Sequence, residues 1–168
     1  MGHKNSKYES YKFDTNNRKN IYGMRLNECR SMNRDVGSWD MHGKCTELNG
    51  GVHQICVSQM KDDFSTKTSQ QNWSKQRNNK PHCVCLGAYA LYTAQNNHID
   101  LKCDAIPETV FDPKYISKWN NWNGNEINNQ GSKAIKKLYK YCYQNTDNKD
   151  HKEHLKNLYK NMKHENQI

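Results

Sequence analysis

Six of the seven cysteines and all four tryptophans of this chain lie between residues 20 and 122. Folded proteins mostly bury these two residue types, so their distribution marks where a core can form. Outside this stretch Lys and Asn dominate, and only 33% of the 168 residues are hydrophobic. We therefore expect one small domain over residues 20–122, with polar segments on both sides of it.

The polar segments are of three kinds. Residues 1–19 contain scattered Lys and Asn without apolar periodicity, which predicts a disordered basic arm. Residues 123–132 are mostly Asn and Gly, a composition typical of a linker. In residues 133–168, apolar side chains recur at helical spacing in two stretches separated by "NTDNKD", which predicts a basic helical hairpin as a C-terminal extension.

Within the domain, the patterns favour both strand and helix. The segment "GVHQICVSQM" (51–60) suits a buried strand, and "CVCLGAYALYTAQNN" (83–97) has apolar residues at helical spacing with Asn96 as a stop. Asp112 followed by Pro113 is typical of an N-cap and the first helical residue, so a short helix should begin there. The fold class is predicted as α+β: a small single domain with a short sheet and packed helices, plus the C-terminal helical hairpin.

The net charge of +9 at pH 7 is concentrated near the two ends of the chain. Basic ends attract phosphate through counterion release, so nucleic acid bound without sequence preference is a candidate partner. No apolar run approaches the roughly 18 residues of a membrane span, and the N-terminus has no apolar signal stretch. We expect an intracellular, non-secreted protein with reduced cysteines and no membrane partner.

The segment "PHCVCLG" (81–87) concentrates potential metal ligands. With residues from the preceding strand, the candidate ligand set holds one histidine and three cysteines: His53, Cys56, Cys83 and Cys85. The ion would be zinc, but structural zinc sites usually show two closely spaced C-x-x-C pairs, and this chain does not. A strand over residues 52–57 would also turn His53 and Cys56 to opposite faces. Zinc is therefore not favoured, and the cofactor stays unknown.

The same cysteines admit two other interpretations. Free cysteine is among the most buried residue types, so Cys56, Cys83 and Cys85 suit the core as small hydrophobic side chains. Alternatively, Cys85 near a helix start would feel the positive end of the helix dipole, which lowers a thiol pKa. Cys85 and Cys56 are then candidate nucleophiles, with His53 as the base. Seven is an odd number of cysteines, and without a secretion signal a complete disulfide framework is not expected.

Several short motifs follow one another over roughly residues 20–120. They are Asn20-Ile21-Tyr22-Gly23 with Leu26 and Cys29; Gly43 and Cys45; Gly51, His53, Ile55 and Cys56; Asn72-Trp73-Ser74; and His82-Cys83-Val84-Cys85. Their order resembles a small family of bacterial and viral proteins, domain of unknown function 2237. The chain departs from the family pattern at His82, where the family has Trp.

The resemblance implies an α+β domain in an intracellular setting and supplies no reaction. A family strand that ends in Leu-Glu-Ala-Thr-His aligns with "LKCDA", so Asp104 and Ala105 occupy its Thr and His positions. Any activity that uses those two groups would be lost in this chain. Viral members resemble this chain in having a basic helical extension, and the Asn/Lys bias suits a large DNA virus.

Three functions are consistent with these observations, and whether the protein is an enzyme stays open. We expect a small binding or accessory module. The first alternative is a thiol-dependent or metal-dependent site built from His53, Cys56, Cys83 and Cys85. The second is a structural virion component whose basic ends contact nucleic acid.

Overall fold

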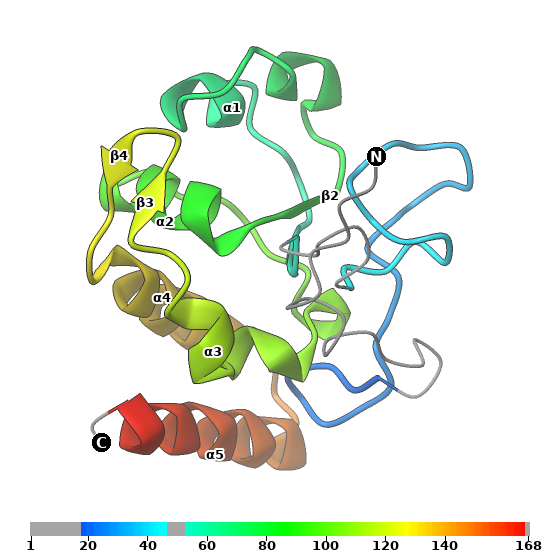
Figure 1. Ribbon diagram of the computed structural model, residues 1–168. Coiled ribbons are helices and arrows are strands. Elements are labelled where there is room, and N and C mark those ends of the chain that lie inside the picture. The colour runs from blue at the N-terminus through cyan, green and yellow to red at the C-terminus, as the bar shows by residue number, and fades with distance from the viewer. Residues whose placement is uncertain (1–17, 47–52, 167–168) are drawn as a thin grey trace.

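The computed structural model describes residues 18–46 and 53–166. Five helices and two short antiparallel sheets lie within these residues, which confirms the α+β prediction (Figure 1). The arm expected over residues 1–19 lies outside the described residues, apart from Arg18 and Lys19. Gly51 of the family-like motif lies outside them as well.

The first sheet joins β1 (Ile55–Val57) to β2 (His82–Val84). The strands are antiparallel, and Cys56 lies directly opposite Cys83. All six residues are buried, as expected for a continuous apolar strand in a domain centre. The sheet therefore lies in the core, and the predicted strand is confirmed at its centre.

Helix α2 (Leu86–Ala94) follows β2 directly. Cys85 is its N-cap, with a sulfur that accepts a hydrogen bond from the Ala88 backbone N–H at 3.4 Å. The helix ends where predicted, because Asn96 adopts a left-handed conformation with φ of 63°. Gly87 permits a close approach: a Cβ built there would lie 2.6 Å from Trp119 Cε3 and 2.9 Å from Trp122 Cε3.

Short helical turns connect these elements. In the chain, helix α1 (Phe64–Lys67) and the 3-10 helix η3 (Ser74–Arg77) follow β1 and precede β2. The 3-10 helices η4 (Cys103–Ala105) and η5 (Glu108–Phe111) precede α3 (Pro113–Ile116). Asp112 caps α3 by accepting a hydrogen bond from the Lys114 N–H at 2.9 Å, with Pro113 at the first helical position, as the sequence predicts.

The segment expected to be a linker over residues 123–132 is structured. Strands β3 (Asn121–Trp122) and β4 (Asn125–Glu126) form a hairpin, and helix α4 (Gln130–Gln144) begins within the predicted linker. Composition missed this because Asn and Gly also suit tight hairpins, and Asn123 and Gly124 both adopt positive φ here. The buried Ile127 then anchors the segment in the core.

The predicted C-terminal helical pair is present as α4 and α5 (Lys149–Asn166), and it packs on the domain (Figure 1). A disulfide joins Cys103 to Cys142, and the Tyr22 hydroxyl donates a hydrogen bond to the Cys142 carbonyl at 2.6 Å. The rings of Tyr139 and Tyr159 stack between the two helices at 4.2 Å. Neither helix, nor any other in the described residues, has the combined length and apolar character that a membrane span requires.

Candidate functional site

A cavity of about 530 Å³ opens between η3, the end of β2 and the β3–β4 hairpin. Three of the four predicted site residues line it: His53, Cys83 and Cys85. His82 lines it too, so the cavity brings together most of the chemistry that the sequence indicated. Cys56 is absent from the lining that the described residues provide, and its side chain is bonded to Cys29.

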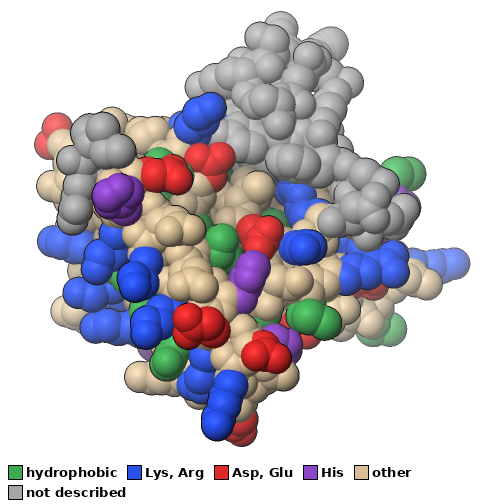
Figure 2. Space-filling view, turned by 90° about the horizontal axis from the view of Figure 1, so that it is seen from below, with side chains coloured by type: hydrophobic (Ala, Val, Ile, Leu, Met, Phe, Trp, Pro, Cys, Tyr) green, Lys and Arg blue, Asp and Glu red, His purple; other side chains and the backbone are tan. Residues whose placement is uncertain are grey.

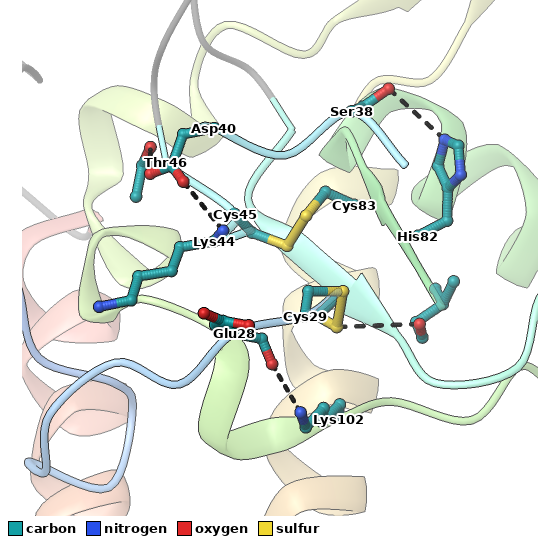
Figure 3. Close-up of a disulfide and its surroundings, with 12 residues drawn as sticks. Glu28, Cys29, Ser38, Asp40, Lys44, Cys45, Thr46, His82, Cys83 and Lys102 are labelled. Atoms are coloured by element: carbon teal, nitrogen blue, oxygen red, sulfur yellow. Dashed lines mark hydrogen bonds between the residues drawn. A yellow bond between two sulfur atoms is a disulfide. The ribbon is translucent and has the colours of Figure 1, made fainter. Parts of the chain in front are cut away.

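Two disulfides remove Cys56 and Cys83 from the candidate thiols. Cys56 is bonded to Cys29, and Cys83 is bonded to Cys45 (Figure 3). A sulfur in a disulfide is neither a nucleophilic thiolate nor a metal ligand. The predictions of reduced cysteines and of a metal or catalytic site with Cys56 and Cys83 as thiols are therefore wrong for this state. The odd number of cysteines misled us, since three pairs leave a single cysteine over.

The remaining cysteine, Cys85, is not an activated thiol. It caps α2 as expected, yet burial raises its pKa to about 12, against the smaller lowering effect of nearby backbone N–H groups. The side chain is 2% exposed. A buried apolar environment disfavours the thiolate more strongly than the start of a nine-residue helix favours it. The expected lowered pKa is therefore wrong.

Aromatic rings form one wall of the cavity. Trp73 stacks on His82 with ring centroids 4.5 Å apart and an interplanar angle of 24°, and Phe64 meets the edge of Trp73 at 6.0 Å. Trp122 contributes from the β3–β4 hairpin, and its indole N–H donates to the Thr68 carbonyl at 2.9 Å. The indole N–H of Trp122 is thus satisfied by the protein, which leaves its ring as an apolar surface.

Buried serines hold this wall in place. Ser65 on α1 and Ser74 on η3 have hydroxyl oxygens 2.8 Å apart, and the backbone N–H of Trp73 donates to Ser65 Oγ at 3.1 Å. Ser74 Oγ also donates to the Asp62 carbonyl at 2.7 Å. Because both hydroxyls are fully buried and bonded, η3 is fixed against α1. This positions Trp73 and Arg77 at the cavity.

His82 is held neutral in the wall. Burial lowers its pKa to about 3, and the nearby positive charges of Arg77 and His53 add to the effect. Its Nε2 lies 3.5 Å from the Ser38 hydroxyl (Figure 3). Its Nδ1 is buried and has no hydrogen-bond partner among the described residues. A neutral ring with a free nitrogen suits ligand recognition, because that nitrogen still needs a partner.

His53 lies just before β1 rather than in it, and burial lowers its pKa as well. It reaches the cavity while Cys56 is committed to a disulfide. Because β1 begins at Ile55, the predicted strand over residues 52–57 does not reach His53. His53 has no nucleophile in Cys56 to activate, since that sulfur is in a disulfide.

Arg77 is the most unusual polar group of the cavity. Its Nε and Nη2 atoms are buried, and neither has a hydrogen-bond partner within residues 18–46 and 53–166. A guanidinium is always charged in proteins, and burying one without a counter-charge is unfavourable. Sequence reasoning missed Arg77, because it lies in the stretch "NWSKQRNNKP" (72–81), whose composition is that of an ordinary polar loop.

Comparisons of the chain with protein-family models, with curated proteins and with solved structures gave no significant match. The resemblance to domain of unknown function 2237, and a viral source with it, therefore stays a prediction.

Proposed function

We propose that the protein is a small binding module whose cavity takes an organic anion, a ligand with one carboxylate or phosphate group and one flat apolar part. The observation that carries the proposal is that two guanidinium nitrogens of the half-buried Arg77, Nε and Nη2, are buried without a hydrogen-bond partner in the described residues.

Arg77 and His82 recognise the anionic group. The guanidinium presents two unused N–H groups, Nε and Nη2, which match the fork geometry of a carboxylate or phosphate. His82 Nδ1 adds a third polar position nearby, since the charge of Arg77 acts on this ring. An anion would satisfy these groups and remove the penalty of burying an unpaired charge.

The apolar part of the ligand packs against the aromatic side chains. Trp73, Trp122, Phe64 and Ala88 contribute to the apolar lining of the cavity. The volume of about 530 Å³ lies in the range of small-molecule sites, which are mostly apolar with a few placed polar groups. This composition supports binding over thiol chemistry, because Cys85 in the same lining holds its proton up to a pKa of about 12.

A fluorescence titration tests the proposal. Trp73 reports on the cavity, and benzoate, phenyl phosphate and the neutral benzamide are matched probes of similar shape. We expect quenching by benzoate or phenyl phosphate and at least a tenfold weaker effect of benzamide. Arg77→Met should abolish this preference for anions, while Lys75→Met, an exposed neighbour on the same 3-10 helix, should keep it.

Equal affinity for benzoate and benzamide in the unaltered protein would refute an anion-binding cavity. Anion binding that survives Arg77→Met but is lost in Lys75→Met would show that the anion binds at the protein surface, outside the cavity. The choice between benzoate and phenyl phosphate tells which anionic group the cavity prefers.

A second proposal rests on the lysines of the C-terminal helices: contact with nucleic acid or another polyanion, as in a virion component. Exposed lysines project from α4 and α5: Lys133, Lys136, Lys137, Lys140, Lys149, Lys156, Lys160 and Lys163. Figure 2, viewed from the side of α5, shows many blue side chains with fewer red ones between them.

Its test needs substitutions rather than truncation, because α4 supplies buried core residues. Changing Lys136, Lys140, Lys156 and Lys160 to Gln should lower retention on a phosphate matrix and flatten its salt dependence. Unchanged retention would show that these four lysines do not form the contact with the polyanion. An intracellular location also stays a proposal. The three disulfides count against it, because disulfides persist mainly in oxidising compartments.

A further inference from the structure

The two disulfides beside the sheet bring four sulfur atoms together. Cys56 and Cys83 are opposite each other on β1 and β2, and each is bonded to a cysteine of the preceding irregular segment, Cys29 or Cys45. The sulfurs of Cys29, Cys45 and Cys56 lie within 4.8 Å of one another, and that of Cys83 is bonded to one of them (Figure 3). All four side chains are at most 1% exposed.

We propose that the reduced form of the protein binds one Zn²⁺ through Cys29, Cys45, Cys56 and Cys83. Tetrahedral zinc thiolate bonds of about 2.3 Å place the sulfurs about 3.8 Å apart. The sulfurs of Cys29, Cys45 and Cys56, which lie within 4.8 Å of one another, are therefore within reach of one zinc ion. Once both sulfur–sulfur bonds are reduced, rotation of the side chains lets each pair separate to about 3.8 Å and brings Cys83 to the fourth position. The result is a closed, dry structural site with four protein ligands.

The reaction balances with a dithiol or phosphine reductant. Reduction of the two disulfides consumes four electrons and four protons and yields four thiols. Zinc binding then releases these four protons as the thiolates form four zinc–sulfur bonds. Metal and disulfides are thus alternative ways of joining the same four side chains.

The backbone holds the four cysteines in place without the sulfur bonds. The Lys102 N–H donates to the Cys56 carbonyl at 3.0 Å, and the Cys83 N–H donates to the Gly37 carbonyl at 2.7 Å. The Cys29 N–H donates to the Gly43 carbonyl at 2.8 Å, which ties the chain around Cys29 to the turn before Cys45. This arrangement presents the ligands before the metal arrives.

A buried aspartate organises the turn that carries Cys45. Asp40 Oδ1 accepts from the Lys44 N–H at 3.0 Å (Figure 3) and from the His42 N–H at 2.7 Å. Asp40 Oδ2 accepts from the Thr46 hydroxyl at 2.7 Å. These bonds involve no sulfur atom. We therefore expect the turn to persist after reduction.

Nearby cations favour the thiolate form. Four thiolates and one Zn²⁺ carry a net charge of −2, and Arg30 and Lys44 are the sequence neighbours of Cys29 and Cys45. Lys102 joins them, since its ammonium donates to the Glu28 carbonyl at 2.6 Å. These three cationic side chains line a second cavity of about 460 Å³ together with Arg25 and, among the described residues, a single acidic one, Glu28, so positive charge prevails there. Positive charge beside a cysteine stabilises its thiolate.

The experiment uses the full chain, reduced with a phosphine under anaerobic conditions and then given Co²⁺ or Zn²⁺ alone. We expect one ion per chain by native mass spectrometry, with the intense visible absorption of tetrahedral cobalt thiolates. The oxidised protein should bind neither ion. Cys45→Ser should weaken binding by more than about 100-fold, because it removes a direct ligand.

Two matched variants separate this site from the other thiols. Cys85→Ala removes the free cysteine, and Cys103→Ala removes a cysteine outside the group; both should keep one ion per chain. Reduced protein without bound metal would overturn the proposal, and so would one ion per chain retained in the double variant Cys29→Ser, Cys45→Ser. A cobalt spectrum that persists in concentrated urea would show binding by the unfolded chain and overturn it as well.

Discussion

Cys56 and Cys83 face each other across the β1–β2 ladder, yet neither is bonded to the other. Each reaches instead to a cysteine of the segment before β1, so two disulfides fasten that irregular segment to the sheet. This segment has little regular secondary structure of its own within residues 18–46. Backbone hydrogen bonds from Ile21 to Ile106 and from Cys83 to Gly37 also join this segment to the rest of the domain, and the two disulfides add covalent links.

Thiol titration checks the cysteine pairing. The oxidised protein should show one reactive thiol per chain in denaturant and almost none when folded, because Cys85 is buried with a pKa raised to about 12. Alkylation followed by peptide mass mapping identifies the residue. Two or more modified cysteines before reduction would contradict the pairing.

Removal of the Cys103–Cys142 disulfide should weaken the whole domain rather than release the helical pair alone. By the loop-entropy relation, a bond over 39 residues stabilises by about 4 kcal/mol. The double variant Cys103→Ala, Cys142→Ala should lower the free energy of unfolding in urea by about that amount, in a single transition. Two separate transitions would show that α4 and α5 unfold independently.

Arg77→Met should stabilise the unliganded protein. Replacing a half-buried guanidinium that has two unsatisfied buried nitrogens by an apolar side chain of similar length is expected to raise the free energy of unfolding by about 1 kcal/mol. Lys75→Met, on an exposed position, should change it by less than about 0.5 kcal/mol. A clear loss of stability in Arg77→Met would mean that the guanidinium has a structural partner.

Stability should fall on acidification because of His82. Its folded pKa is lowered to about 3 from 6.5, so the unfolded chain binds the proton more readily, and stability is lost as pH falls from about 6.5 toward 3. The contribution is about 1.4 kcal/mol per pH unit at most. His82→Phe should flatten urea midpoints over this range, whereas Ser38→Ala, which keeps the ring, should not. An unchanged slope in His82→Phe would refute this assignment.

Local signals in the sequence predicted local structure well. The Asp112-Pro113 cap and the Asn96 stop depend only on a few neighbouring residues, and both are found where expected. The strand around Cys56 and the helix after Cys85 follow from apolar patterns that the core then buries. The same locality explains why the helical pair was predicted while its docking was not.

The disulfide partners and the cavity depend on contacts between distant residues. Cys29 and Cys45 lie in a segment without periodicity, so no pattern points to their partners 27 and 38 residues onward. Arg77 enters the cavity because Ser65 and Ser74 hold η3 on α1. The cap position of Cys85 was predictable, but its burial, which decides the pKa, was not.

Gly87, which is not itself in the observed lining of the cavity, determines where one of the lining side chains can lie. Trp119 and Trp122 lie against the first turn of α2 only because Gly87 has no Cβ, and Trp122 lines the cavity. A single methyl group there would require both indoles to shift, and Trp122 is part of the cavity lining. The shape of the cavity therefore depends on a residue outside the observed lining, because even an alanine at position 87 would not fit beside the two indoles as they stand.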